Sequence, residues 1–599
     1  SGLDAAQTQI TATGHNITNA DSEHYTRQRV VQSAREPFHD MPGDIGTGTK
    51  VDTVVRVHDE FTFARLRTSN INLESSEYKK QILEEISQRF PDLQSVGIGR
   101  DLQNYFNAWN NLASNPTEGS QKVNLLNSAA TLSNSINKAH DMLTKIQKDV
   151  DSQIEVAVNE INKYAKQIAQ INKEIVRVES VGTTRANDLR DKRDQLELAM
   201  SKFAGISVFK GQLQSNNIDP TVTDMGTKHQ INISGFNIVD GTTYHPLTVD
   251  RISDKSDFKG VFFERDDSKK VDLNGRISGG KLGAALDLRG RRVDDNGEFQ
   301  DGTIQKYIDN LNTFAKGIIN ETNNIYARSA VENAVTDELD GLSDSRTLMN
   351  FNDDIKHGSF DVVVYNNQGQ EVARKTININ ASTTINDNTR GNSIVRDFNS
   401  DTDSLNDVDD YFQANYQYDA ATGKGTFGVT AKRNAGEYSV AFVDKGTNFP
   451  GIIGVNRVFE GGNAKNMSVK SELMENPHKL KAYSNPTPGN NEVANDMVQM
   501  QYKKIIFYSD KHADKEESVE GYYRYITTDL ASQTQANNDL NDANTAIHKV
   551  AMSEYQSVSG VNLNEELTNL IRFQSSYGAA AKIITTVEKM LDTLLTLKQ

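Results

Sequence analysis

The segment TGKGT, from Thr422 to Thr426, is the part of the chain most similar to a phosphate-binding loop. Such a loop carries a further glycine five residues before the Gly-Lys pair, because backbone N–H groups along the loop cradle the phosphates. The residue five positions before Gly423 is not glycine. A β-hairpin turn explains the segment better, and no cofactor is predicted.

The run DTDSLNDVDD, residues 401–410, begins with the carboxylates of a calcium loop. It lacks an oxygen ligand at the fifth position and the glycine at the sixth, both of which the calcium loop needs. We expect a solvated acidic loop here rather than a metal site.

Other chemistry has little support among the ionisable residues. The 11 histidines form no HExxH pair, and no GxSxG segment occurs. The cluster VHDEF at 57–61 places three ionisable residues in a row, but consecutive residues do not share a helical face, so a polar loop at a helix start is expected. The absence of cysteine excludes disulfides and thiolate chemistry. No catalytic residue or metal ligand is predicted, and we expect a protein that is not an enzyme.

Length and charge restrict the class further. A chain of 599 residues exceeds what one core usually supports, so several domains are expected. The net charge of −16 disfavours nucleic acid and anionic membranes as partners. No apolar run is long enough for a membrane-spanning helix, and the first residues lack a signal-peptide pattern.

The elements of the fold follow from hydrophobic periodicity. Apolar residues recur at alternating steps of three and four from Leu132 to Val178, with one stutter between Val150 and Ile154. This predicts a single helix over about 121–179, which by itself is typical of any large helical bundle. Partner helices are expected before Pro91, around Trp109, up to Gly205 and over about 304–329.

The pattern changes to strands in two places, so the predicted fold class is α+β and mainly α. It comprises a long coiled-coil-like helical bundle built from both chain ends, with one or two β-rich inserted lobes. Within the insertion, SFDVVVYNNQGQEVARKTININ (359–380) and GTFGVTAKRNAGEYSVAFV (425–443) are each expected to form two strands around a turn. The expected domains are terminal polymerisation helices (1–54 and 551–599), a discontinuous helical frame (55–330 and 490–550, with a β subregion at 206–290) and a β-rich outer insertion (331–489). Helical pattern resumes near Glu492 and continues to Gln599, broken at SVSGVNLNEE.

The apolar heptad patterns at the two chain ends differ in strength. Residues 563–594 carry a clean heptad seam of large apolar side chains, whereas the seam between Leu3 and Ile17 contains small or polar residues. The N-terminal helix is therefore expected to be marginal alone, since it buries too little surface to offset its backbone entropy.

These ends, SGLDAAQTQITATGHNITNADSEHYTRQ (1–28) and SVSGVNLNEELTNLIRFQSSYGAAAKIITTVEKMLDTLL (557–595), resemble the paired terminal segments of the bacterial flagellar axial family. Asn16, Asn19 and Ala20 fall on the asparagine-rich turn of its rod, hook and hook-associated members. The run from Tyr25 to Gln28, together with SGVNLNEE, is similar to the hook-associated type, because rod and hook proteins usually carry Gly-Phe in place of Tyr25 and Thr26. The inner segments ANDLRDKRDQL, SGGKLGAALDLRG and NFPGIIGVNRVFEGGNAKNMSV are also similar to that type.

The resemblance implies a secreted structural protein at the junction of the flagellar hook and filament, exported unfolded, with residues preceding Ser1. Implied partners are further copies of the chain, hook protein, the next hook-associated protein towards the filament and a cytoplasmic export chaperone. The terminal helices would pair as a coiled coil when copies stack into a tube. The implied assembly residues are Leu3, Ala6, Ile10, Asn16, Ile17, Asn19, Tyr25, Thr26, Arg27, Leu563, Leu567, Leu570, Phe573, Tyr577, Ile584, Val587, Leu591 and Leu594.

Two alternatives remain open from the sequence. The chain could be another axial protein of hook, rod or flagellin type, which the Tyr25–Gln28 match disfavours. It could instead be an enzyme or adhesin displayed on the flagellum, with its activity in the insertion.

Overall fold

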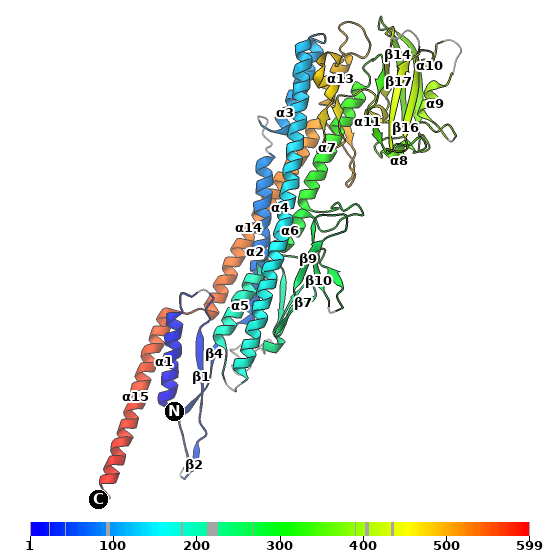
Figure 1. Cartoon of the computed structure of the whole chain (residues 1–599). Helices are drawn as coiled ribbons and strands as arrows, with labels where there is room; N and C mark the ends of the chain where they lie inside the picture. Colours follow the sequence, from blue (N-terminus) through cyan, green and yellow to red (C-terminus); the bar gives the residue numbers. More distant parts are fainter. Residues whose placement is uncertain are drawn as a thin grey trace. The chain divides into compact units, whose positions relative to one another are not determined.

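A computed structural model of the chain describes residues 2–22, 24–41, 43–90, 96–180, 184–211, 226–265, 267–389, 391–401, 406–432 and 436–597 (Figure 1). Contacts divide it into two compact units. Unit 1 comprises Ser1–Leu83, Gln147–Thr303 and Thr534–Gln599, and unit 2 comprises Glu84–Ile146 and Ile304–Gln533. The boundaries between these units fall inside long helices, so they do not test the expected domain boundaries, which stay predictions.

Helices dominate the fold, as the sequence predicts. The longer ones are α1 (Gly2–Thr18), α2 (Glu60–Arg89), α3 (Ile98–Ser114), α4 (Gly119–Glu179), α5 (Asn187–Ser201), α6 (Gly280–Arg289), α7 (Thr303–Tyr326), α13 (Glu492–Met500), α14 (Val519–Ser559) and α15 (Leu563–Thr596). Among the described residues, no helix combines the length and apolar character that crossing a membrane requires.

The heptad seam predicted over 121–179 is confirmed as the single helix α4. Its apolar positions are buried on one face, including Val150 and Ile154 on either side of the stutter. In unit 1, polar residues beside this seam bind the β subregion: the Asn172 side-chain amide donates to the Gly241 carbonyl at 2.7 Å, and Asn162 donates to that of Leu247 at 2.8 Å. The helix therefore carries a core face flanked by hydrogen-bonding anchors.

Unit 1 also contains strands. In its N-terminal part β1 (Gln28–Ala34) pairs antiparallel with β4 (Thr49–Arg56), and the ribbon between them closes as β2 (Phe38–Asp40) and β3 (Gly43–Ile45). The predicted β subregion forms two small sheets. They are ordered β5-β6-β7-β8 (Ile206–Phe209, Gln230–Ile233, Phe236–Asp240 and Thr243–Tyr244) and β11-β10-β9 (Lys270–Asp272, Lys259–Glu264 and Leu247–Arg251).

The segment SGGKLGAALDLRG has a glycine where two backbone segments of unit 1 approach each other closely. Gly280 begins α6 at φ +60°, and a Cβ there would lie 2.4 Å from the carbonyl carbon of Phe203. Only glycine fits a left-handed conformation at such a contact. The motif thus fixes α6 against the end of α5.

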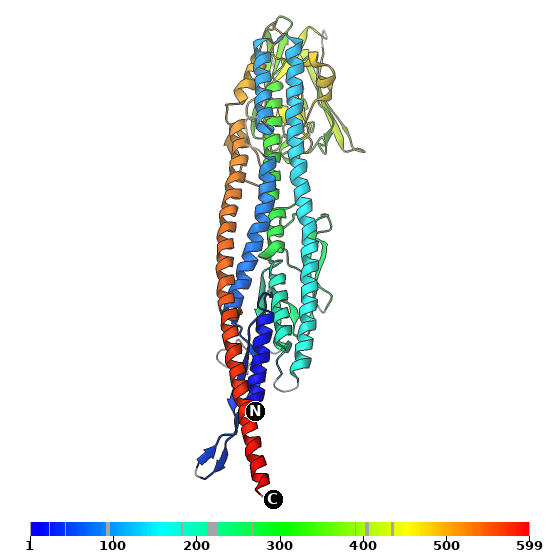
Figure 2. The same cartoon turned by 90° about the vertical axis from the view of Figure 1, so that its left-hand side faces the viewer.

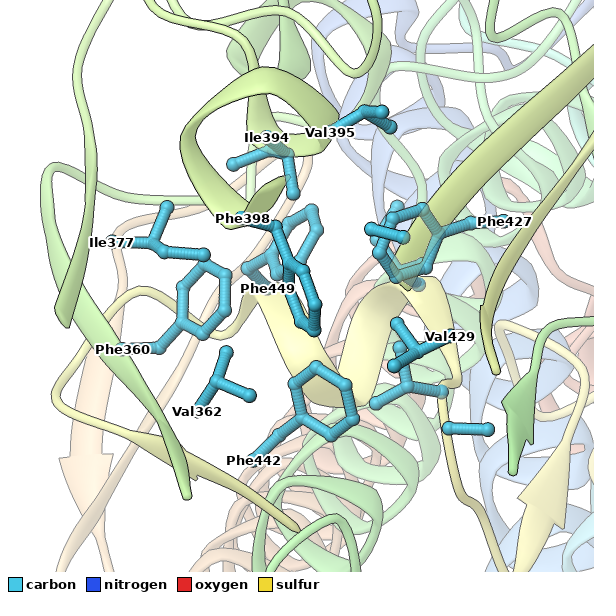
Figure 3. Packing of buried hydrophobic residues seen from close by; sticks show 14 of the residues in the cluster. Phe360, Val362, Ile377, Ile394, Val395, Phe398, Phe427, Val429, Phe442 and Phe449 are labelled. Atoms are coloured by element: carbon cyan, nitrogen blue, oxygen red, sulfur yellow. The ribbon is translucent and has the colours of Figure 1, made fainter. Parts of the chain in front are cut away.

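The β-rich insertion in unit 2 has its own core, in which Phe360, Phe398, Phe427, Phe442 and Phe449 are all at most 1 % exposed (Figure 3). Two sheets surround it, ordered β15-β14-β18 and β12-β17-β13, with β16 also paired to β17. Their strands are β12 (Ala334–Val335), β13 (Leu339–Asp340), β14 (Gly358–Asn366), β15 (Glu371–Ile379), β16 (Phe412–Asp419), β17 (Lys424–Ala431) and β18 (Tyr438–Asp444). The core extends from Ala327 to Val455, and short helices α8 (Leu348–Phe351), α9 (Ile394–Asn399), α10 (Val408–Tyr411) and α11 (Phe449–Ile453) contribute to it.

Two local expectations need correction. The segment GTFGVTAKRNAGEYSVAFV reads as a hairpin, but its two strands, β17 and β18, lie in different sheets, because β16 and β14 take their edges. The helical pattern after Glu492 is interrupted by a hairpin of β21 (Ile505–Phe507) and β22 (Lys515–Glu517). Ile505 and Phe507 are buried while Ile506 is exposed, which is the period of a strand, too short to stand out between helices.

Candidate assembly interface

The two chain ends meet within unit 1, where α1 lies beside the first half of α15 and runs antiparallel to it (Figures 1 and 2). The fully buried residues of α1 are Ala5, Ala6, Ala12, Thr13 and Asn16, and its larger apolar residues Leu3, Ile10 and Ile17 are partly buried. On α15 only Glu566 is buried. The marginal stability of the N-terminal helix stays a prediction, but a single copy of the chain already pairs the helices that the resemblance pairs in the tube.

Asn16 joins three segments through its side-chain amide. Its Oδ1 accepts from the Gln28 N–H at 2.9 Å, and its Nδ2 donates to the Gln28 carbonyl at 2.9 Å, so the amide pairs with that residue of β1 as a strand neighbour would. The same Nδ2 donates to Glu566 Oε2 at 3.0 Å, and the hydroxyl of Tyr25 donates to Oδ1 at 2.9 Å. All four hydrogen-bonding positions of the amide are thus filled in a site where Asn16 is 2 % exposed.

Tyr25 completes this polar cluster. Its hydroxyl oxygen lies 2.9 Å from Nδ1 of His15. Burial raises the pKa of Tyr25, and the neighbouring carboxylates of Asp191, Asp188 and Glu566 raise it further. The hydroxyl therefore stays protonated and keeps its role as a donor to Asn16. We call the set His15, Asn16, Tyr25, Gln28 and Glu566 the terminal clasp.

Arg27 and Thr26, which follow Tyr25, connect the terminal clasp to α14 and to α5. The Arg27 N–H donates to the Ser559 carbonyl at the end of α14 at 2.9 Å, and its guanidinium lies 3.2 Å from an exposed Glu565 carboxylate. An exposed ion pair of this kind contributes little. The buried Thr26 N–H donates to Asp191 Oδ2 on α5 at 3.1 Å. The turn after α1 is therefore held mainly by backbone hydrogen bonds.

Asp191 belongs to a buried ionic cluster at the root of the terminal segment. Arg56, at the end of β4, donates to Asp191 Oδ1 at 2.9 Å and to Asp194 Oδ2 at 2.5 Å, and all three side chains are nearly inaccessible. Burial alone would raise the pKa of Asp194, but the charges of Arg56 and Lys210 hold it well below its usual range. Both aspartates are therefore compensated by cations from elements far apart in the sequence.

The same cluster continues towards the β subregion. Lys210 Nζ lies 2.8 Å from Glu60 and 3.5 Å from Glu197, and Glu197 accepts from His229 Nε2 at 2.7 Å and from Arg67 at 3.0 Å. Burial lowers the pKa of His229 to about 4, so the ring is neutral at pH 7. We call residues Arg56, Glu60, Arg67, Asp191, Asp194, Glu197, Lys210 and His229 the root cluster. It fastens β4 and α2 to α5 and the β subregion within unit 1.

The structure places the residues implied by the resemblance in three groups. Ala6, Asn16 and Thr26 are buried, and Leu3, Ile10, Ile17, Asn19, Tyr25, Arg27, Leu570 and Phe573 are partly buried. Leu563, Leu567, Tyr577, Ile584, Val587, Leu591 and Leu594 are between 36 % and 62 % exposed. The heptad seam of α15 is therefore partly covered by α1 in its first half and uncovered in its second.

Sequence reasoning missed Glu566, Arg56 and Asp191 as members of the site. ANDLRDKRDQL was noted only for its resemblance, yet it supplies Asp191 and Asp194 to the root cluster. VHDEF was expected to be a polar loop at a helix start. Its last two residues begin α2, as expected, but His58 is only 8 % exposed and shares a hydrogen bond with the partly buried Glu60. His58 lies before α2, so its side chain is not restricted to one face of that helix and can lie beside Glu60.

The two candidate ligand loops of the sequence have structural roles. TGKGT forms the turn between β16 and β17, with Gly423 at φ +72°, as predicted. In the acidic run, residues 402–405 lie outside the described residues. Asp407 is buried rather than solvated, and its Oδ2 lies 3.1 Å from the ammonium group of Lys375. Over the described ranges, no group of three His, Cys, Asp or Glu side chains could hold a metal ion.

Comparison with known proteins matches two family models. Residues 83–333 match the flagellar hook-associated protein FlgK helical domain, and residues 552–597 match the C-terminal model of flagellar basal body rod FlgEFG proteins. Flagellar hook-associated protein 1 of Salmonella typhimurium is 24 % identical over 604 residues, covering 100 % of this chain and 98 % of the relative. That of Escherichia coli is 22 % identical over 601 residues, with the same coverage. A solved flagellar hook junction protein FlgK from Burkholderia pseudomallei aligns with a TM-score of 0.48 at 14 % identity, covering 82 % of this chain and 100 % of that one.

Both family models describe proteins of the bacterial flagellum, and this is the class of protein that the chain resembles. Within that class, the chain is similar over its whole length to flagellar hook-associated protein 1.

Proposed function

We propose that the chain is a structural component of the flagellum that joins the hook to the filament by self-assembly into the axial tube. The observation that carries this proposal is the second half of α15. There Ile583, Ile584, Val587, Met590, Leu591, Leu594 and Leu595 are all at least 49 % exposed, as is Leu597 directly after the helix. Contiguous apolar surface of this kind marks an interaction site.

The geometry of the terminal pair supports self-assembly. The helix α1 has 17 residues and α15 has 34, so α1 can cover only about half of its partner. The heptad seam nevertheless continues to Leu594, and a seam that extends beyond its partner is completed by a helix from another molecule. Further copies of the chain are the first such partner. Hook protein, the next hook-associated protein and, before export, a cytoplasmic chaperone are the other partners that this role requires.

The test separates assembly from folding. We expect Ile584→Asp with Leu591→Asp to abolish junction formation in a flagellated strain lacking its own copy, with flagellin released into the medium. Because both side chains are more than half exposed, the free energy of unfolding of the purified monomer should change by less than about 0.5 kcal/mol.

A matched control places the same charges on the polar face of the same helix. Thr585→Asp with Thr593→Asp should leave junctions intact, since both threonines are exposed and bond only their own helix. Normal junctions with the first pair of substitutions, or a monomer that melts many degrees lower, would contradict the proposal.

A further inference from the structure

We infer that the hydrogen bond between Asn16 and Glu566 sets the register of α1 on α15, and so determines which part of α15 stays free for a neighbouring copy. This inference rests on the proposed function. It concerns positioning residues within the terminal pair rather than the apolar surface that makes the assembly contact.

Apolar packing does not distinguish registers that differ by one heptad. The fully buried apolar residues of α1 are Ala5, Ala6 and Ala12, and its larger, partly buried residues Leu3, Ile10 and Ile17 recur every seven positions. The seam of α15 repeats from Leu570 and Phe573 through Tyr577 to Ile584 with heptad spacing. A slip of seven residues, about 10 Å along the helix, therefore presents α1 with an equivalent surface.

The polar contact is satisfied in one register only. Asn16 is held to Gln28 by two hydrogen bonds, so its amide cannot follow a sliding helix without leaving β1. Glu566 is 4 % exposed, and Asn16 is its partner on α1. A slip would leave a buried carboxylate without that partner, which costs more than the net gain from any one formed bond. A single buried polar contact is a known means of fixing the register of paired helices at some cost in stability.

The register has a consequence for assembly. Eleven residues make about three helical turns, so in an antiparallel pair Ala5 is expected opposite Tyr577 when Asn16 is opposite Glu566. The N-terminus of α1 then ends near residue 580, and the exposed positions from Ile583 onwards stay free. A slip of one heptad towards the C-terminus would cover Ile584 and Val587, removing two contacts that the neighbouring copy needs.

The test uses the full chain, in which every cysteine is an introduced one. Ala5→Cys is combined with Tyr577→Cys to report the observed register, and with Leu570→Cys or Ile584→Cys to report slips of one heptad in either direction. A short bifunctional maleimide then joins whichever pair is close. With Asn16 and Glu566 intact, we expect product from the 5/577 pair and only background from the other two.

The decisive variant is Glu566→Leu, which removes the acceptor on α15 and keeps the bonds of Asn16 to Gln28 and Tyr25. We expect a slipped pair to gain about tenfold or more in cross-linked product, and junction assembly without the reporter cysteines to fall. Protection of α1 amides from hydrogen exchange should change little, because Asn16 stays bonded to Gln28. Glu565→Leu makes the same chemical change at an exposed neighbour and should keep the register, as should Glu566→Gln, which retains an acceptor for Asn16.

Two outcomes would overturn the inference. One is that the Glu566→Leu variant cross-links only through 5/577 and assembles normally. The other is that it loses α1 protection and assembly together, which would make the contact simply stabilising. If instead the register is fixed as expected but Ile584→Asp with Leu591→Asp assembles, the proposed function fails while the register role stands.

Discussion

Asn16 and Glu566 lie 550 positions apart in the sequence and share a hydrogen bond of 3.0 Å at a site where both side chains are buried. This bond ties the end of the first helix to the start of the last one. Thr26, ten residues after Asn16, binds Asp191 of the root cluster. The terminal helices and the root cluster are therefore linked through one short turn, so a change in either place is expected to affect the other.

The root cluster should be sensitive to loss of one cation. Arg56→Met leaves the buried carboxylates of Asp191 and Asp194 without their main partner, and breaking a buried ion pair in this way costs about 3–5 kcal/mol. Urea unfolding followed by circular dichroism should show an earlier transition. The fluorescence of Trp109, the single tryptophan and a residue of unit 2, should change little at that transition. Arg29→Met, at an exposed position on β1, serves as the control. Equal stability of the two variants would show that the cluster does not need Arg56.

His229 makes the stability of unit 1 depend on pH. Its pKa falls from 6.5 to about 4 on folding, because burial and the charge of Arg193 disfavour the protonated ring. As pH falls, His229 is protonated in the unfolded chain at a higher pH than in the folded chain. The contribution of neutral His229 to the stability of unit 1 is therefore fully present above pH 6.5 and is lost as pH falls towards 4. Burial raises the pKa of Glu197, but Lys210 and His229 lower it to about 2, so a second loss follows between pH 4.5 and 2.

The measurement is the unfolding midpoint at pH 7, 6, 5 and 4. We expect His229→Gln to flatten the decrease between pH 6.5 and 4. His39→Gln, on the exposed β2 strand, should leave the decrease unchanged. A wild-type midpoint that is constant over this range would contradict the prediction.

Local patterns in the sequence predict much of the fold. The heptad seam of α4, the hairpin of β14 and β15 and the break between α14 and α15 depend on residues close together in the chain, and all three are present. The small residues that the sequence places in the N-terminal seam are buried in α1, whose marginal stability stays a prediction. These features could be predicted because periodicity and turn residues act over a few positions.

The clasp and the root cluster could not be predicted in the same way. Charged runs are usually solvated, so ANDLRDKRDQL gave no sign that Asp191 and Asp194 are buried. Their burial is possible only because Arg56 and Lys210 arrive from other elements to compensate the charge. Asn16 could be assigned by resemblance, but its partner Glu566 depends on how two ends of the chain meet, which no local pattern contains.

Gly280 offers a test of the backbone contact between α5 and α6. Gly280→Ala combines a left-handed conformation, which costs roughly 1–2 kcal/mol for a non-glycine residue, with a clash against the backbone of Phe203. We expect a loss of at least about 2 kcal/mol in the unfolding free energy of unit 1. Gly275→Ala, where a Cβ would meet no atom within 4 Å, should be close to neutral. Similar stabilities for both variants would show that the segment relaxes without cost.

The β-rich insertion should fold by itself. Its core residues lie between Ala327 and Val455, and they include five phenylalanines that are almost inaccessible to solvent. A fragment of residues 327–456 keeps every strand of both sheets, whereas a cut at residue 331 would remove Ala327, whose carbonyl accepts from Phe442 of β18 at 2.9 Å. We expect the fragment to unfold in one cooperative thermal transition, since segments with their own core fold independently.

Phe398→Ala should lower the stability of this fragment by about 3–5 kcal/mol, because the ring is fully buried between the two sheets. The exposed Tyr502, outside the fragment, provides the control in the full chain, where Tyr502→Ala should leave the transition of the insertion in place. A fragment that shows no cooperative transition would mean that the insertion needs the rest of unit 2 to fold.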